Sequence, residues 1–296
     1  MKNKKPMKKE NPPKLRFVAN TWSLVQYPSA KNEWTLERKV KAIKEAGFDG
    51  ITTISTPELK KLADKHGLII IGYFASAKAG EFRKLLKQNA DNGGHYINVQ
   101  LADEDTLTPE ALKLTLRLMK EAEAIGCEPS VEIHRDTCTE TPEKAYALAD
   151  GYRKATGKYL PMTLDYSHVS VVKHLHPGNY AEKLLVQPKL IQRAELIHLR
   201  PFNGHHCQIP VTDGKGNLTP EIKEWLPFAE ALFRVWRQGN QAGRELYVCP
   251  EMGPVAGGYN LHSLPNSWEE AIVLKGLIEK AWKASALPEK KAKKKG

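Results

Sequence analysis

The sequence predicts one α/β domain, a closed (β/α)8 barrel of the TIM type. Three observations predict it. Eight short apolar segments alternate with amphipathic segments, the 296-residue length suits one barrel, and polar side chains recur at the ends of the later apolar segments. A parallel strand with its returning helix takes about 30 residues and a whole barrel about 250. We therefore expect the barrel over residues 16–285, between lysine-rich tails at 1–15 and 286–296 that we expect to be disordered.

The first half of the chain holds four strand-helix pairs. Strands are expected at 16–22, 50–54, 68–74 and 95–101, and helices at 34–46, 57–66, 78–91 and 108–126. The continuous apolar run at 68–74 is typical of a parallel strand covered on both faces. Helix ends are indicated by glycines, and the start at Thr108 by a cap-like threonine followed by Pro109 at the first helical position.

The second half continues the alternation. Strands are expected at 128–134, 160–166, 194–201 and 245–252, and helices at 141–157, 219–238 and 266–285. Two connections, 167–193 and 201–218, are longer than a barrel needs and carry several histidines. Long loops at the carboxyl rim of a barrel usually determine substrate specificity.

Four of these strands end in a side chain that can bind a metal. Glu132 alternates with Val131 and Ile133, so it points to the face opposite them. The same alternation places Asp165, His198 and Glu251 opposite the aliphatic residues of their strands, and Glu132, Asp165 and His198 follow one another at intervals of 33 positions. Because parallel barrel strands end at one rim, we expect the four side chains to converge there.

Three carboxylates and an imidazole at one point require a counter-charge, since neighbouring carboxylates raise each other's pKa. One divalent cation supplies it: an oxygen-rich set with one nitrogen suits Mn²⁺, Mg²⁺ or Co²⁺, and Zn²⁺ is also compatible. Taken singly, each residue is more often a helix cap, an ion-pair partner or a structural histidine. The shared end and face of four consecutive strands favours the metal site.

The net charge of +11 comes from the two ends of the chain. Residues 1–16 carry seven Lys or Arg and one Glu, and 283–296 carry six Lys and one Glu, which leaves 32 basic and 32 acidic residues between them. A neutral body argues against specific nucleic-acid binding, although lysine-rich ends can also act as weak tethers to polyanions.

The sequence indicates a cytoplasmic protein. The basic start lacks the apolar run of a secretory signal, and no segment approaches the roughly 20 apolar residues of a membrane span. Cys127, Cys138, Cys207 and Cys249 form no Cys-x-x-Cys pair, which suits free thiols in a reducing compartment.

The strand-end motifs resemble those of the xylose isomerase-like barrel superfamily, which includes sugar isomerases, ketose 3-epimerases, inosose dehydratases and endonuclease IV. They read Val131-Glu132-Ile133-His134-Arg135, Leu164-Asp165-Tyr166-Ser167-His168, Ile197-His198-Leu199-Arg200 and Pro250-Glu251-Met252. The resemblance covers residues 16–285 and implies that Glu132, Asp165, His198 and Glu251 bind the metal, while His168 and Arg200 contact substrate oxygens.

The expected function is that of a divalent-metal-dependent sugar or polyol isomerase or epimerase in carbohydrate metabolism. A metal that chelates a carbonyl and its neighbouring hydroxyl acidifies the adjacent C–H and holds the enediolate. Glu132 and Glu251 would then remove a proton and return one on the opposite face. A ketose or keto-polyol is the expected partner, and homo-oligomer formation is left open.

Four further residues are candidates for substrate binding. His134, beside Arg135, either reaches substrate or orients a ligand, with a solvated rim pair as the alternative. Trp22 and Gln100 end the first and fourth strands and would supply an apolar wall and a hydrogen-bonding group, although core packing is the alternative for Trp22. His206, on the loop after the seventh strand, would form part of a lid or contact the substrate.

Several other functions compete with this one. A dehydratase of a keto-inositol or a C-glycoside-cleaving lyase needs the same metal, and a non-catalytic barrel that binds a sugar or a partner protein is an alternative of another class. Endonuclease IV-like activity is disfavoured, because Tyr73-Phe74, Val99-Gln100 and Asp213-Gly214-Lys215 stand where that branch has further metal ligands.

Overall fold

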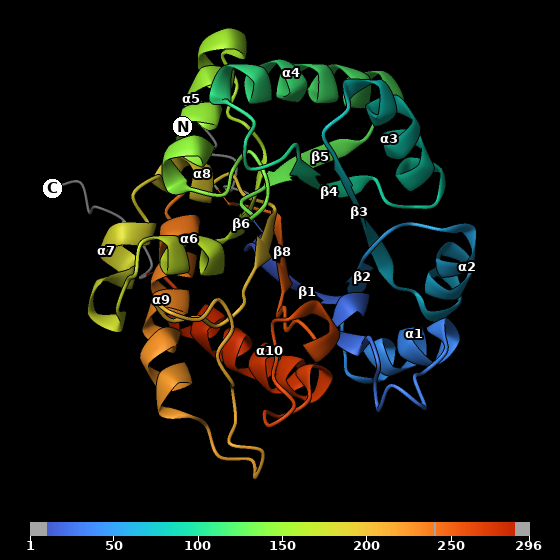
Figure 1. Cartoon of the computed structure of the whole chain (residues 1–296), viewed down its shortest axis with the longest axis vertical. Coiled ribbons are helices and arrows are strands. Elements are labelled where there is room, and N and C mark those ends of the chain that lie inside the picture. Colours follow the sequence, from blue (N-terminus) through green and yellow to red (C-terminus); the bar gives the residue numbers. More distant parts are fainter. Residues whose placement is uncertain (1–10, 240, 288–296) are drawn as a thin grey trace, which may run out of the picture.

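The predicted barrel is confirmed by the computed structural model, which describes residues 11–239 and 241–287. Eight parallel strands close in sequence order, and β1 pairs with both β2 and β8. The strands are β1 (Lys14–Asn20), β2 (Gly50–Thr52), β3 (Ile69–Ser76), β4 (Tyr96–Leu101), β5 (Glu128–Glu132), β6 (Met162–Asp165), β7 (Leu196–His198) and β8 (Glu245–Cys249). Figure 1 shows the helices as a ring outside them.

The helices follow the expected order, with three short additional helices. They are α1 (Leu36–Glu45), α2 (Pro57–His66), α3 (Phe82–Asp91), α4 (Thr108–Ile125), α5 (Pro142–Thr156), α6 (Tyr166–Val172), α7 (Tyr180–Leu184), α8 (Pro188–Ile191), α9 (Pro220–Arg237) and α10 (Ser267–Ala284). The connection expected at 167–193 therefore contains most of three short helices, α6 to α8.

Threonine-proline pairs open three of the helices. Thr56, Thr141 and Thr219 each accept a hydrogen bond from the backbone amide three residues ahead, and a proline follows each of them. The start predicted at Thr108 differs, because Thr108 is itself helical and Leu107 precedes the helix without a side-chain cap.

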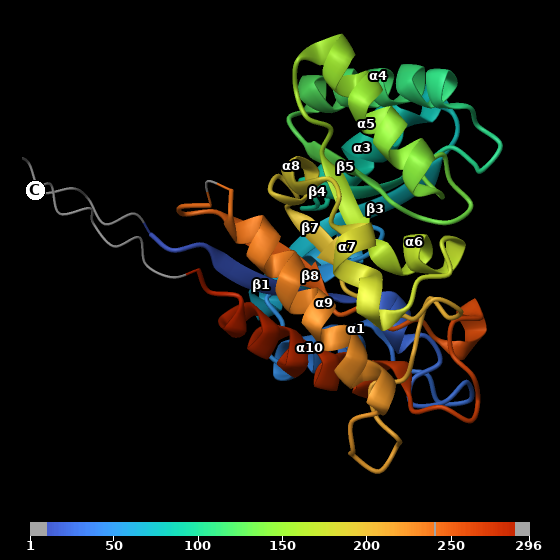
Figure 2. The ribbon, with the colours of Figure 1, turned by 90° about the vertical axis from the view of Figure 1, so that its left-hand side faces the viewer.

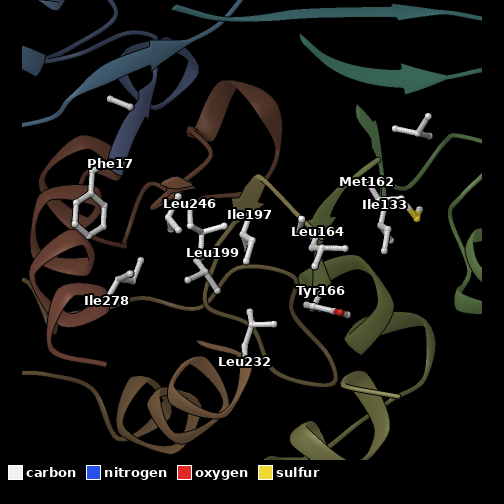
Figure 3. Packing of buried hydrophobic residues seen from close by; sticks show 14 of the residues in the cluster. Phe17, Ile133, Met162, Leu164, Tyr166, Ile197, Leu199, Leu232, Leu246 and Ile278 are labelled. Carbon is white, nitrogen blue, oxygen red and sulfur yellow. The ribbon is translucent and has the colours of Figure 1, made fainter. Parts of the chain in front are cut away.

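The core has two layers. Inside the barrel, Val18, Ile71, Leu196 and Cys249 form a small buried cluster. Outside it, the opposite faces of the strands pack on the helices; Figure 3 shows side chains from the β6 to β8 region, such as Leu164 and Leu246, gathered near Leu232 of α9 and Ile278 of α10. The polar inward-facing residues lie above this apolar interior layer, at the carboxyl rim.

The rim lies on the side of the barrel opposite the start of β1 and the end of α10. Figure 2 shows α6 and the loops after β7 and β8 on one side, and the start of β1 with the end of α10 on the other. β1 begins at Lys14, two residues before the predicted strand. Most of the two predicted tails, 1–10 and 288–296, lies outside the described residues. Within the described chain, none of the helices has the length and apolar character that crossing a membrane requires.

Candidate metal centre

The four strand-end residues meet in one buried cluster. Glu132, Asp165 and His198 are the last residues of β5, β6 and β7, and Glu251 follows β8 by two residues. Asp165 pairs with His198 across the β6–β7 ladder, which sets these two side by side. One ligand atom from each of the four residues lies within 4.8 Å of the others, and all four side chains are buried.

Several polar atoms of the cluster have no hydrogen bond. His198 Nδ1 lies 2.8 Å from Glu132 Oε1 and 3.5 Å from Glu251 Oε2, yet neither ring nitrogen of His198 has a hydrogen bond. Asp165 Oδ2 is likewise buried without a hydrogen bond. Buried polar atoms without partners are costly, and a cation shared by these atoms would satisfy them. Three carboxylates and one imidazole therefore fit a divalent metal ion.

Side-chain amides hold the two glutamates in place. Asn98 Nδ2 and Gln100 Nε2 both donate to Glu132 Oε2, at 2.8 and 2.9 Å, so Oε1 is the oxygen that faces His198. Asn20 Nδ2 donates to Glu251 Oε1 at 2.7 Å. The Tyr73 hydroxyl in turn donates to Gln100 Oε1. Such outer contacts orient metal ligands and tune their basicity.

Arg200 contacts two carboxylates of the cluster through one of its terminal nitrogens. Its side chain is buried, and Nη2 forms an ion pair with Glu251 and lies 3.5 Å from Asp165 Oδ2. His168, also buried, places Nε2 3.4 Å from the same oxygen of Asp165. The expected substrate contact of Arg200 is thus limited to donors other than Nη2; its Nε has no hydrogen-bond partner among the described residues.

The ionisation of the cluster follows from these contacts. Burial opposes the charge of Glu251, but His198 and Arg200 outweigh burial and lower the pKa of this carboxyl. Burial also lowers the pKa of His198, yet Glu251 and Glu132 raise it well above its usual value. Without an ion these contacts favour a protonated imidazole beside the two carboxylates, and a metal ion would have to replace that proton.

A cavity of about 340 Å³ opens above the cluster. Trp22 and Ile54 contribute apolar surface to it, and His134, Arg135 and Tyr259 line it as well. A larger cavity of about 610 Å³ lies around the amino ends of β4, β5 and β8 but includes none of the four cluster residues, so the smaller cavity is the one relevant to their chemistry.

The other predicted site residues divide into two groups. Trp22, Gln100 and His134 line the cavity, and the His168 ring lies 4.3 Å from that of His134 between centroids. His206 does not line this cavity. Its backbone amide and Nδ1 both lie within hydrogen-bond distance of Asn203 Oδ1, which ties this exposed residue to its own loop.

Three site residues escaped the sequence reasoning. Asn20 and Asn98 interrupt apolar strands on their inward faces, in Val18-Ala19-Asn20 and Ile97-Asn98-Val99, and that alternation was a usable signal. Tyr259 lies in the loop after β8, where no periodicity identifies it.

Fold and cluster together define a class: (β/α)8 barrels with a buried carboxylate-histidine group at the carboxyl rim that could hold a metal ion. No family model matches the sequence, and no curated protein matches it. Solved structures do. An L-ribulose 3-epimerase matches with TM-score 0.64 at 14% identity, covering 92% of this chain and 95% of the other.

Two further solved structures are similar to this chain. A D-allulose 3-epimerase from Methylomonas sp. in complex with D-allulose has TM-score 0.58 at 14% identity, covering 92% of this chain and 99% of the other. A xylose isomerase-like TIM barrel protein from Mycobacterium smegmatis in complex with magnesium has TM-score 0.53 at 16% identity, covering 90% and 97%. The chain therefore has the xylose isomerase-like TIM barrel fold.

Proposed function

We propose that the protein is a divalent-metal-dependent isomerase or epimerase of a ketose or keto-polyol. The observation that carries the proposal is the convergence of Glu132, Asp165, His198 and Glu251 from four consecutive strands, with unpaired atoms at the centre. The similarity to sugar epimerases supports the reaction class. The donor set favours Mn²⁺, Mg²⁺ or Co²⁺, and Zn²⁺ is compatible.

The proposed reaction moves one proton away from a carbon and returns one to it. A bound divalent ion supplies Lewis acidity toward the carbonyl and its neighbouring hydroxyl. One carboxylate, Glu132 or Glu251, takes the acidified C–H proton, and the electron pair of that bond forms the enediolate. The other glutamate, protonated from solvent beforehand, delivers its proton to the opposite face, and the first glutamate then releases the proton it took to solvent. Trp22 and Tyr259, which line the cavity, help to exclude water.

Solvent exchange tests this proposal most directly. In D2O, the metal-loaded protein should introduce deuterium beside the carbonyl of at least one member of a panel of ketoses and keto-inositols. Glu132→Gln and Glu251→Gln should abolish the exchange, whereas Glu128→Gln, at the far end of the same strand as Glu132, should retain it. Absence of exchange across the panel would instead favour a non-catalytic sugar-binding barrel, and exchange followed by loss of water would indicate a dehydratase.

Metal content is the second test. The purified protein should hold about one divalent ion per chain, and Asp165→Asn should lower that content sharply. We further propose a reducing compartment such as the cytoplasm, since Cys127, Cys138, Cys207 and Cys249 form no disulfide.

A further inference from the structure

The loop after β5 presents one arginine at the mouth of the cavity. The hydroxyl of Thr139 donates to the carbonyl of Glu132, and that of Thr137 donates to the carbonyl of His134 at 2.7 Å. Asp136 turns the chain with φ 58°, a left-handed conformation that a non-glycine residue adopts at some cost. The loop is thus held from inside, and Arg135 lies at its exposed turn while lining the cavity.

The charge of Arg135 has no strong partner in the described chain. Its guanidinium carbon lies 4.6 Å from the centre of the Tyr259 ring, and that of Arg200 lies 4.4 Å from the same centre. Its one ion-pair contact is with the adjacent Asp136, at 3.5 Å, and the two side chains are 52% and 74% exposed. Pairs this exposed contribute little, because water screens both charges.

Arg135 adds a positive charge at the cavity mouth that the cluster does not balance and that pairs only with the exposed Asp136. The carboxylates of Glu132, Asp165 and Glu251 are balanced by Arg200 together with one divalent ion, given a neutral His198. Arg135 then adds one positive charge that nothing in the cluster neutralises. The guanidinium carbons of Arg135 and Arg200 lie 4.6 and 4.4 Å from the centre of the Tyr259 ring, so the distance between them is at most the sum of these two values. A six-carbon sugar can span that separation.

We propose that the substrate is an acidic keto-sugar, whose anionic group at the end remote from the carbonyl binds Arg135. This inference rests on the proposed isomerase function and specifies its substrate class. A single planar guanidinium matches a carboxylate through two parallel hydrogen bonds, so a sugar carboxylate is favoured over a phosphate.

Matched substrates test the inference. With the Mn²⁺-loaded protein, deuterium exchange should proceed with at least tenfold higher kcat/KM for D-fructuronate than for D-fructose. Arg135→Met should bring this ratio close to one, and Arg135→Lys should give an intermediate ratio. Arg38→Met is the matched control, since Arg38 is also a partly exposed arginine stacked on an aromatic ring, Trp34, away from the cavity, and the ratio should not change. D-fructose 6-phosphate forms a third arm; an Arg135-dependent preference for it alone supports an anionic substrate and assigns the anion to phosphate.

A binding measurement separates this inference from the proposed function. Calorimetric affinity for D-fructuronate should fall at least tenfold in Arg135→Met, whether or not exchange occurs. Exchange that is equally fast for the acid and the neutral ketose, or a preference for the acid that survives in Arg135→Met, would overturn the acidic substrate and leave the isomerase proposal standing. Absence of exchange with every ketose, combined with Arg135-dependent binding, would overturn the isomerase proposal alone.

Discussion

At the scale of single residues, the cluster depends on neutral amides as much as on charges. Asn98 and Gln100 give Glu132 two hydrogen bonds on one oxygen, and Asn20 gives one to Glu251. An amide NH2 group can only donate, so it favours the ionised carboxylate and fixes which oxygen faces the centre. A charged donor would do this more strongly but would also compete with a bound cation.

Replacing Asn98 should therefore weaken the site without removing a ligand. Asn98→Leu keeps the size of the side chain but deletes one of the two donors to Glu132 Oε2. We expect metal affinity or kcat/KM to fall about 10- to 100-fold, as is usual for residues that orient ligands. Asn92→Leu, an exposed change at the end of α3, serves as the control in metal titrations and exchange assays. Equal metal affinity and exchange in the two variants would remove Asn98 from the positioning role.

Single side chains also show what the sequence could predict. Strand alternation was sufficient to bring Glu132, Asp165, His198 and Glu251 together, because it fixes the face and the barrel fixes the rim. It could not predict that Arg200 would pair with Glu251, since that contact depends on the positions of two different strands. Nor could it place His206, whose orientation depends on a local turn around Asn203.

At the scale of elements, α6 begins on a residue of the cluster. Asp165 is the N-cap of this helix, and its Oδ1 accepts a hydrogen bond from the Ser167 amide at 2.9 Å, while Oδ2 faces the site without a hydrogen bond. One oxygen of Asp165 thus caps the helix, and the other oxygen is available to a metal ion. The helix also brings His168 to the same residue.

Two substitutions at Asp165 should separate these roles. Both substitutions should lose metal and the charge that faces Arg200 and His168, but asparagine is as good an N-cap as aspartate. Metal-free Asp165→Asn should therefore be about 1 kcal/mol more stable than metal-free Asp165→Ala. Chemical denaturation of the metal-free variants measures the difference. A metal-free Asp165→Asn protein that is no more stable than Asp165→Ala would contradict the capping role.

The loop after β8 is shaped by its contact with Trp22. A methyl group on Gly257 would lie 2.5 Å from the Trp22 ring, and one on Gly253 equally close. Both glycines therefore permit the close approach of this loop to the indole, which also meets the Tyr259 ring edge-on at 4.9 Å. The shape of the cavity wall depends on two glycines that carry no chemistry of their own.

Adding a single methyl group should disturb this wall. Gly257→Ala is expected to lower kcat/KM roughly 10-fold or more, because small displacements in a binding wall are costly to catalysis. Metal content should not change, since Gly257 touches no cluster residue. Gly276→Ala, within α10 where no neighbouring atom lies within 4 Å, should be neutral or stabilising by up to about 1 kcal/mol. Full activity in Gly257→Ala would show that the wall tolerates the displacement.

Element boundaries were predicted less well than element order. Strands β7 and β8 are shorter than the segments expected at 194–201 and 245–252, since the apolar pattern continues past the last ladder hydrogen bond. The three short helices at 166–191 were missed because α7 and α8 span only five and four residues, too few to show a helical period.

At the scale of the whole molecule, a bound ion would connect the ends of four strands at a single point. Residues on β5, β6 and β7 and just after β8 supply the atoms, and several of these have no other partner. Because an ordered set of ligands exists only in the folded state, metal binding adds directly to folding free energy. At a metal concentration of 100 times Kd the gain is about 2.7 kcal/mol.

This coupling predicts a pH-dependent thermal shift. For a domain of this size, about 2.7 kcal/mol corresponds to a rise in Tm of roughly 5–10 °C. The raised pKa of His198 means that its proton stabilises the metal-free fold below the usual pKa of 6.5, and this contribution is lost as pH rises through the higher folded value. Because the ion must displace that proton, metal affinity should increase up to about tenfold per pH unit across this window.

Melting curves with and without Mn²⁺ at fixed concentration, between pH 6 and pH 8.5, would measure the effect. The metal-induced shift should grow with pH in the wild-type protein and nearly vanish in Asp165→Asn at every pH. A shift that is constant across the range would show that no proton is exchanged for the ion at His198. A shift equally large in Asp165→Asn would place the bound metal elsewhere on the molecule, and the convergence of the four strand ends would then need another explanation.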